Sequence, residues 1–159
     1  MSYDTIRIGN IVRYVGNLRE HYYTVGEVLS IDKTHDDKNS YSLKVKDWHK
    51  KEYEIRAYEN EIWPITLDID HLNKLNAVKH DGINVFMLDA LTLVRPIFTY
   101  NEPPARYIDK GFVVIEGNLT INSTEDEFDK LSTPVTSLHT LQNYFQDKLH
   151  KTLDKSIFL

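Results

Sequence analysis

Two neighbouring segments with strictly alternating side chains constrain the fold of this chain more than any other feature. In residues 41–46 (YSLKVK) and 52–57 (EYEIRA), every second side chain is apolar or aromatic and the ones between are polar. A period of two places the apolar side chains on one face of an extended strand. The short stretch at residues 47–51 closes the two strands into a hairpin. The sequence therefore predicts antiparallel strands that are buried on one face only.

Three more short strands are predicted in the first part of the chain, at residues 11–15, 22–31 and 61–65. Gly26 falls inside the second of them and suggests a bend or a bulge. Pro64 has to lie at an edge or at a strand end, because it has no N–H group to donate to a ladder. Five short strands in about 65 residues predict a small, strongly bent barrel or half-barrel.

The spacing of apolar residues changes after residue 65. Residues 66–79 follow a helical period, with Asp68 as a plausible N-cap and Asn76 as a left-handed stop. Strands are expected again after Gly82, and Pro103 lies in a long loop between two of them. The expected strands are residues 83–88, 91–97, 112–116 and 119–121.

The final segment predicts an amphipathic helix of three to four turns that begins near Ser137. Its apolar arc consists of Leu138, Leu141, Phe145, Leu149 and Leu153. Its polar side consists of His139, Asn143, Gln146, Asp147 and His150. We expect this helix to cover the sheet of residues 83–121. The predicted fold is α+β, with an N-terminal antiparallel small barrel (1–65), a short linking helix, and an antiparallel sheet packed by the C-terminal helix (66–159), together forming one compact unit.

Composition excludes several classes of protein. The 159 residues contain no cysteine, so disulfides and thiolate chemistry are absent. The formal net charge is −5. No apolar run reaches the length of a membrane span, and the first residues do not have the layout of a secretory signal. We therefore expect a soluble, intracellular globular protein. The negative charge is concentrated in the second part of the chain, with its densest run at Glu125, Asp126, Glu127 and Asp129.

The sequence shows no local signature of catalysis, so we expect a protein that is not an enzyme. It contains no glycine-rich phosphate loop, no Gly-x-Ser-x-Gly elbow and no His-Glu-x-x-His pair. No set of ligands has a spacing suited to a metal ion, and we predict neither a metal nor a cofactor. A catalytic site assembled from distant residues would leave no such signature.

The sharpest polar set is His139, Gln142 and Asn143 in the C-terminal helix. His139 and Asn143 share a helical face because they are four residues apart. Gln142 lies within the apolar arc, where a buried amide has to be hydrogen-bonded, so we expect it to tie the helix to the backbone of a strand. The set is interpreted either as a ligand or partner site or as a polar lock that fixes the position of the helix.

Tyrosine is unusually frequent, with ten residues, of which seven lie in the first sixty. Half-buried barrel residues would account for them, and so would an aromatic groove for a peptide, a nucleotide or single-stranded nucleic acid. The candidates for such a groove are Tyr14, Tyr22, Tyr41, Trp48 and Tyr53. The four lysines that surround Trp48 form either a solvated hairpin or a weak site for single-stranded nucleic acid.

Three segments carry a resemblance to known sequences: IRIGNIVRYV at residues 6–15, IWPITL at 62–67 and SLHTLQNYF at 137–145. In this order and spacing they resemble an uncharacterised small-protein family of Bacteroidota genomes and their phages. The middle segment departs from the family pattern at Thr66, where a second proline is expected. The resemblance implies a phage or mobile-element setting, and with it the cytoplasm of a bacterial host, and no particular chemistry.

These observations together predict a non-enzymatic protein-interaction module that occupies the surface of a protein partner, such as a host defence system that it would inhibit. An acidic surface suits this role because it can block a nucleic-acid channel electrostatically. The same bulk charge opposes direct binding of nucleic acid. The alternatives are a small-ligand or nucleotide-binding module with a tyrosine-rich groove, and weak binding of single-stranded nucleic acid.

Overall fold

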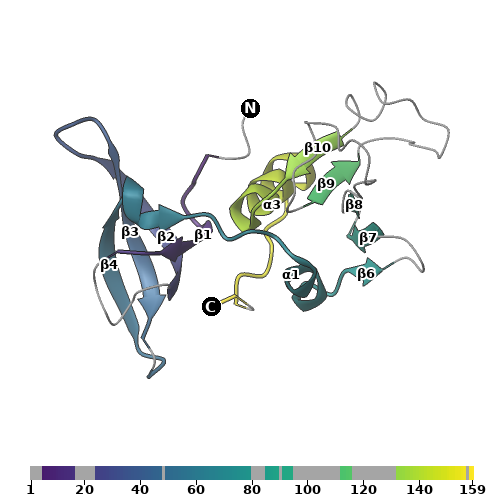
Figure 1. The fold of residues 1–159 in the computed structure, drawn as a ribbon, viewed down its shortest axis with the longest axis horizontal. Coiled ribbons are helices and arrows are strands. Elements are labelled where there is room, and N and C mark those ends of the chain that lie inside the picture. Colours follow the sequence, from purple (N-terminus) through teal and green to yellow (C-terminus); the bar gives the residue numbers. More distant parts are fainter. Residues whose placement is uncertain are drawn as a thin grey trace, which may run out of the picture. The chain divides into compact units, whose positions relative to one another are not determined.

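The computed structural model describes residues 5–16, 24–47, 49–79, 85–89, 91–94, 112–115, 132–156 and 158–159. It has the predicted α+β composition, with two antiparallel five-stranded sheets and a helix near the C-terminus (Figure 1). The chain divides into two compact units, one comprising Met1–Ile65 and Leu138–Leu159 and the other Thr66–Ser137. No helix in the described part of the chain has the length and apolar character needed to cross a membrane.

The first unit is built on a sheet with the strand order β4-β3-β2-β1-β5, in which all neighbours are antiparallel. The predicted hairpin of β3 and β4 is present, and the two strands pair in continuous register from Ser40↔Tyr58 to Lys46↔Glu52. The elements are β1 (Ile11–Tyr14), β2 (Thr24–Lys33), β3 (Asn39–Lys46), β4 (Glu52–Tyr58), the 3₁₀ turn η2 (Glu59–Glu61) and β5 (Ile62–Trp63).

The sheet is open and does not close into the small barrel expected from the sequence. Its last strand, β5, contains only two residues, which pair with Arg13 and Tyr14 of β1. Pro64 then ends the ladder because it has no N–H group. The strands β4 and β5 therefore form the two ends of the strand order. The irregularity expected at Gly26 lies slightly later, where the β2–β3 register shifts between Val28 and Ser30.

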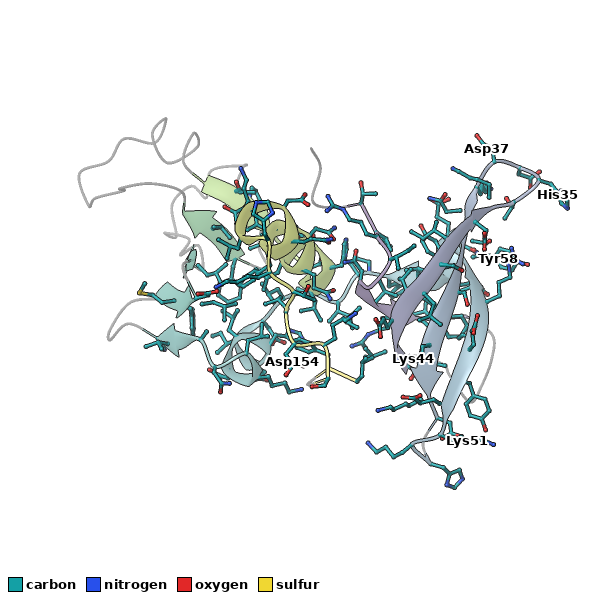
Figure 2. The ribbon with its side chains drawn as sticks, turned by 180° about the vertical axis from the view of Figure 1, so that it is seen from behind. His35, Asp37, Lys44, Lys51, Tyr58 and Asp154 are labelled. Atoms are coloured by element: carbon teal, nitrogen blue, oxygen red, sulfur yellow. The ribbon has the colours of Figure 1, made fainter. Side chains whose placement is uncertain are left out.

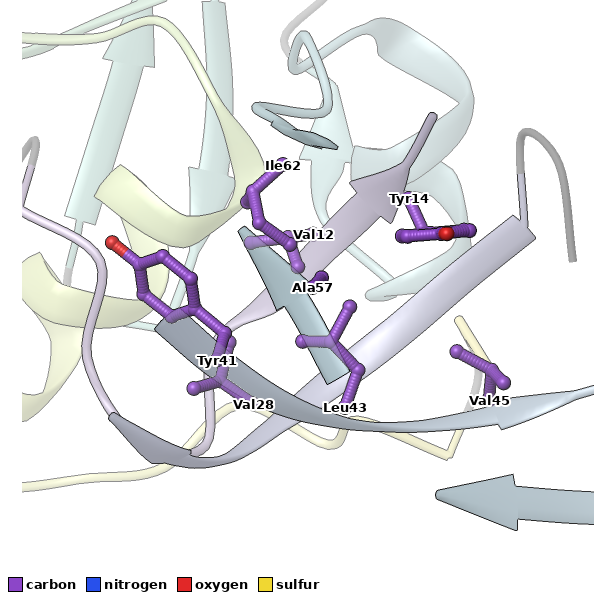
Figure 3. Close-up of a cluster of buried hydrophobic side chains, with 8 residues drawn as sticks. All are labelled: Val12, Tyr14, Val28, Tyr41, Leu43, Val45, Ala57 and Ile62. Carbon is purple, nitrogen blue, oxygen red and sulfur yellow. The ribbon is translucent and has the colours of Figure 1, made fainter. Parts of the chain in front are cut away.

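One face of this sheet carries the hydrophobic core of the first unit (Figure 3). The alternating apolar residues predicted for β3 and β4 contribute to it, and Ile31, Tyr53 and Ile55 pack against its margin. Its buried members are Val12, Tyr14, Val28, Tyr41, Leu43, Val45, Ala57 and Ile62. Tyr14 and Tyr41 are only 2% and 4% exposed, so their rings belong to this core and do not line a groove.

The C-terminal helix belongs to the first unit, which differs from the expected division at residues 1–65 and 66–159. It consists of α3 (Leu138–Tyr144) and a wider π-helical turn, η3 (Phe145–Leu149), and it ends at His150 with a φ of 53°. All residues of α3 are buried, including His139 and Asn143, which the amphipathic pattern placed on a polar side. The difference arises because these polar groups have hydrogen-bond partners within the protein, so the helix needs no face toward water.

The second unit contains a sheet with the order β10-β9-β8-β7-β6 and the short helix α1. Asp68 caps α1 by accepting a hydrogen bond from the His71 N–H at 3.1 Å, and Asn76 adopts the predicted left-handed conformation with a φ of 59°. The elements are α1 (Ile69–Lys74), β6 (Val78–Lys79), β7 (Val85–Leu88), β8 (Leu91–Val94), β9 (Phe112–Ile115) and β10 (Ser132–Val135). Sequence reasoning did not find β6, and the strand expected at 119–121 lies outside the described residues.

Candidate functional site

Gln142 makes the backbone hydrogen bonds that its place in the apolar arc of the helix predicts. Its side-chain Oε1 accepts from the N–H of Ile11 at 2.8 Å, and its Nε2 donates to the carbonyl of Gly9 at 3.2 Å. In the β1–β5 ladder only Arg13 and Tyr14 of β1 have partners. The side chain of Gln142 thus provides the hydrogen-bond acceptor for the N–H of Ile11, a residue of β1 that does not pair with β5.

Asn143 continues this polar connection along the segment that precedes β1. Its Oδ1 accepts from Asn10 Nδ2 at 2.9 Å, and its Nδ2 donates to the carbonyl of Thr5 at 2.8 Å. One turn later, Arg7 forms two parallel hydrogen bonds with the Asp147 carboxylate, at 2.8 and 2.9 Å. The hydrogen bond from Arg7 lowers the pKa of Asp147 below its ordinary value, although desolvation opposes the shift. We call the set Gln142, Asn143 and Asp147, with the residues they bind in 5–11, the helix clamp.

The helix clamp favours the structural interpretation of the polar set. Asn143 is fully buried and His139 is 5% exposed, and both have partners within the protein. The side-chain amides of Gln142 and Asn143 form hydrogen bonds with the chain's own backbone and with the side chain of Asn10. A ligand would have to displace these bonds. The clamp therefore positions the helix and the N-terminal segment, and the candidate contact surface has to be sought elsewhere.

The face of the first sheet opposite its core carries a row of residues that crosses all five strands. Directly opposite residues of antiparallel strands share a face, and Tyr14 and Ile62 face the core, so their neighbours Arg13 and Trp63 face outward. Pairing of Arg13 with Val25 extends the row to β2, and the β2–β3 and β3–β4 registers continue it. The outer row consists of Trp63, Arg13, Val25, Lys46 and Glu52. Trp63 is 51% exposed, which is unusual for so large an apolar side chain.

A pocket of about 280 Å³ adjoins the outer row at the start of β2 and the end of β3, beside the β3–β4 hairpin. Cationic and apolar groups line it together, and Phe158 from the C-terminal segment forms part of its wall. Its charged lining residues are Lys44, Lys46, Lys50, Asp47 and Glu52. The combination suits a partner group that carries negative charge next to an apolar part, although the two carboxylates offset some of the positive charge.

Glu27 fixes the C-terminal segment to the outer face of the sheet. Lys155 Nζ contacts Glu27 Oε1 at 2.5 Å, and Lys44 Nζ lies 3.4 Å from Oε2. Burial alone would raise the pKa of Glu27, but the hydrogen bonds and charges of Lys155 and Lys44 hold it below its ordinary value. Glu27 therefore remains a charged anchor at neutral pH and is unsuited to donating a proton.

The carboxylate of Asp47 organises the β3–β4 hairpin. Its Oδ1 accepts from the Lys51 N–H at 2.9 Å, and Lys50 takes up a left-handed conformation with a φ of 65°. Although desolvation opposes it, hydrogen bonds from the backbone of Lys51 and His49 and from Tyr53 lower the pKa of Asp47. The ammonium group of Lys51 lies 5.4 Å from the centre of the Tyr53 ring. These contacts support the interpretation of the lysine-rich stretch as an ordered hairpin.

The structure separates the residues that the sequence singled out. Tyr53 lies at the margin of the core, and Tyr14 and Tyr41 lie within it, so these three tyrosines do not form a common groove. Tyr22, Trp48 and the acidic run Glu125, Asp126, Glu127 and Asp129 lie outside the described residues. Sequence reasoning missed Trp63 and Arg13 as candidates. The segment EIWPI gave no signal for this, because a tryptophan beside Ile62 is expected to be buried and its exposure is a property of the folded sheet.

Among the described residues, no group of three or more histidine, aspartate and glutamate side chains is arranged to hold a metal ion. Comparison of the chain with protein-family models, with curated proteins and with solved structures gave no match.

Proposed function

We propose that this chain is a non-enzymatic protein-interaction module of phage or mobile-element origin that inhibits a host defence system by occupying the surface of one of its proteins. The resemblance of three segments to proteins of Bacteroidota and their phages supports the setting. Arg13 and the lysines that line the pocket suit acidic groups on the surface of that partner. The contact that we propose is the end of the outer row formed by Trp63 and Arg13.

The observation that carries the proposal is the exposure of Trp63 beside Arg13. Tryptophan and arginine are the residue types that most often dominate binding energy at protein interfaces. Trp63 is held on β5 by pairing with Arg13, so its position is fixed by the sheet before a partner arrives. Preorganised anchors lose little conformational entropy on binding. The pocket of about 280 Å³ farther along the outer row, at Val25, Lys46 and Glu52, provides a recess for a side chain of the partner.

Affinity capture tests the proposal. The tagged chain is immobilised and exposed to lysate of a Bacteroidota host, and captured proteins are identified by mass spectrometry. The wild-type chain is expected to retain a defined partner, and Trp63→Ala to lose it, because truncation of a central tryptophan weakens binding by about 2 kcal/mol or more, or roughly thirtyfold. The matched control is Val78→Ala, which truncates a side chain that is 67% exposed in the second unit.

The outcomes are distinct. Capture of the same partner by wild type and Val78→Ala, with loss in Trp63→Ala, supports the proposed contact. Recovery of no protein above the bare resin, or equal capture by wild type and Trp63→Ala, contradicts it. Circular dichroism of each variant shows that the sheet is intact, so that loss of capture reports on the surface.

A second candidate function, binding of a small anionic ligand such as a nucleotide, is favoured by the pocket at the hairpin. Lys44, Lys46 and Lys50 can attract a phosphate, and Phe158 can contact a base. A thermal-shift screen with nucleotides tests it, because a ligand at 100 times its Kd adds about 2.7 kcal/mol of stability. Lys50→Ala is expected to reduce the shift, and Lys38→Ala on the other hairpin to preserve it. No shift with any nucleotide removes this candidate.

A further inference from the structure

The strand β4 ends the first sheet with an edge that no strand among the described residues covers (Figure 1). The Asp47 N–H donates to the carbonyl of Lys51 at 3.0 Å, one step beyond the pair of Lys46 and Glu52. Because antiparallel pairs alternate between bonded and non-bonded residues, the backbone groups of Glu52, Glu54 and Arg56 are directed away from β3. In agreement, the N–H of Tyr58 donates to Glu61 Oε2 at 2.9 Å instead of to a strand.

The side chains of β4 form two different rows at this edge. On the outer face, Glu52, Glu54, Arg56 and Tyr58 are exposed. On the core face, Tyr53 and Ile55 are only half-buried, because no further strand lies beyond them in the described part of the chain. Figure 2 labels Lys51, which immediately precedes β4, and Tyr58, its last residue. An added strand would gain backbone hydrogen bonds and would also cover these two apolar side chains.

We propose that the occupant of this edge is β4 of a second copy of this chain, paired antiparallel about a two-fold axis at Ile55. This register places Glu54 opposite Arg56 of the other copy, and the two-fold axis repeats the pair in reverse. It also places Tyr53 opposite Ala57. The opposite-charge pair of Glu54 and Arg56, present twice, thus joins the copies.

The free hydrogen-bonding groups and the two faces of the sheet agree with this register. Glu54 and Arg56 both direct their backbone groups outward, so the two residues can exchange both hydrogen bonds across the interface. Core-face residues lie opposite core-face residues, so Ile55 meets its own copy beside Tyr53 and Ala57. Among the described residues, Glu54 accepts one hydrogen bond from Ser42, and Arg56 gives one N–H to Ser40 at 2.9 Å. Most of the donors of the Arg56 guanidinium remain for the partner.

Charge selects this register over its neighbours. An axis at Glu54 would pair Glu52 with Arg56 twice but would oppose the two copies of Glu54 at its centre, and an axis at Arg56 would oppose two arginines. An axis at Tyr53 would place Glu52 opposite Glu54 twice. Like charges directly opposite each other destabilise a strand pair, and opposite charges stabilise it by roughly 0.2–1 kcal/mol each. Only the axis at Ile55 pairs both charged residues of the strand centre with opposite charges.

The length of β4, seven residues, makes this a small interface for a protein dimer. The dimer is therefore expected to be weak and to depend on concentration. Its molecular mass in solution, measured by sedimentation velocity from low micromolar to about 1 mM chain, should rise from 18.7 kDa toward twice that value. A mass of one chain over the whole range overturns the proposal.

Reversal of the charges at Glu54 and Arg56 tests whether the edge of β4 forms the dimer interface. Glu54→Arg places two guanidinium groups opposite each other on both sides of the axis, and Arg56→Glu does the same with two carboxylates. Each variant is expected to raise the dissociation constant about tenfold or more. The double variant Glu54→Arg with Arg56→Glu restores opposite charges and should restore the dimer. Glu52→Arg is the matched control, because it makes the same change on the same face opposite the uncharged Tyr58.

The results for the single and double variants show whether a second copy of this chain occupies the edge of β4. Loss of the dimer in both single variants and its return in the double variant supports self-pairing. A dimer that persists in both single variants, or that does not return in the double variant, contradicts it. Unchanged circular dichroism is required of each variant, so that a loss of fold is not read as a loss of pairing.

A thiol at the axis gives a second, independent measurement, since the chain contains no cysteine. In Ile55→Cys the two introduced thiols face each other across a non-hydrogen-bonded pair, where the Cα atoms lie about 4.5 Å apart and a disulfide is allowed. Mild oxidation should yield a dimer on a non-reducing gel. Glu52→Cys should remain a single chain, because its copies lie far from each other in this register. Equal cross-linking of the two variants contradicts the proposed axis.

Discussion

Replacement of Gln142 by alanine should destabilise the first unit through one particular backbone group. The Ile11 N–H donates to Gln142 Oε1 at 2.8 Å, and Ile11 is fully buried. In Gln142→Ala this donor loses its partner at a site that water does not reach. A buried donor without a partner costs about 1–3 kcal/mol.

The second hydrogen bond of Gln142 contributes less. Its Nε2 donates to the carbonyl of Gly9 at 3.2 Å, next to a cavity of about 170 Å³ that both residues line. Water in this cavity can take over the bond to Gly9, so its loss adds only a fraction of the usual ~1 kcal/mol. The free energy of unfolding should therefore fall by about 2–3 kcal/mol, a large share of the stability of a typical domain.

Amide hydrogen exchange of Ile11 is the most direct assay, because it reports on the group that loses its partner. A loss of ~2.7 kcal/mol corresponds to exchange about a hundredfold faster. The matched control is Gln146→Ala, one turn later in the same helix, where the side chain is exposed. Urea unfolding of both variants measures the change in total stability. If Gln142→Ala changes neither the exchange of Ile11 nor the urea midpoint more than Gln146→Ala does, the role assigned to the clamp is refuted.

Three further changes test other features of the first unit. Gly26→Ala places a Cβ 2.9 Å from Val45 Cγ1, so the melting temperature should fall by the equivalent of roughly 1–3 kcal/mol of overpacking. Lys50→Gly removes the strain of a φ of 65° and should raise stability by roughly 0.5–1 kcal/mol in urea titrations. The ion pair of Glu27 with Lys155 lowers the carboxyl pKa in the folded state, so its contribution is complete above the unfolded value of about 4.3 and declines as the pH falls through the lowered folded pKa. Unfolding curves of Glu27→Gln should therefore lie below those of the wild type at pH 7 and approach them in this acid range; a difference that is constant with pH contradicts the assignment.

Local patterns in the sequence were sufficient for most of the first sheet. Period-two alternation located β3, β4 and the hairpin between them, and Asp68 and Asn76 marked the ends of α1 because capping depends on neighbouring residues. The need of a buried amide for partners also predicted that Gln142 binds strand backbone. Each of these features is determined by residues close in sequence or by a single group.

Relations between distant residues were not accessible in the same way. Helical periodicity placed His139 and Asn143 on a polar side, because it cannot show that Asn10 and the carbonyl of Thr5, more than 130 positions earlier, satisfy the Asn143 amide. The sheet stays open because the pairing of β5 with β1 ends at Pro64 after two residues, and the length of that pairing cannot be read from the alternation of side chains. The exposure of Trp63 is likewise a property of the folded sheet. A tryptophan that follows an isoleucine predicts burial by composition alone.

The two proposed contacts use opposite ends of the same strand order, and this has a consequence for binding. Trp63 lies on β5 and Ile55 on β4, with three strands between them. Pairing through β4 therefore leaves the Trp63 contact of each copy free, and a dimer carries two such contacts on one continuous sheet. A partner that presents two equivalent sites would be held more tightly by the dimer than by one chain, because the second contact forms within the complex. Glu54→Arg would then weaken capture of that partner while leaving Trp63 in place, whereas a partner with a single site would be captured equally well by both forms.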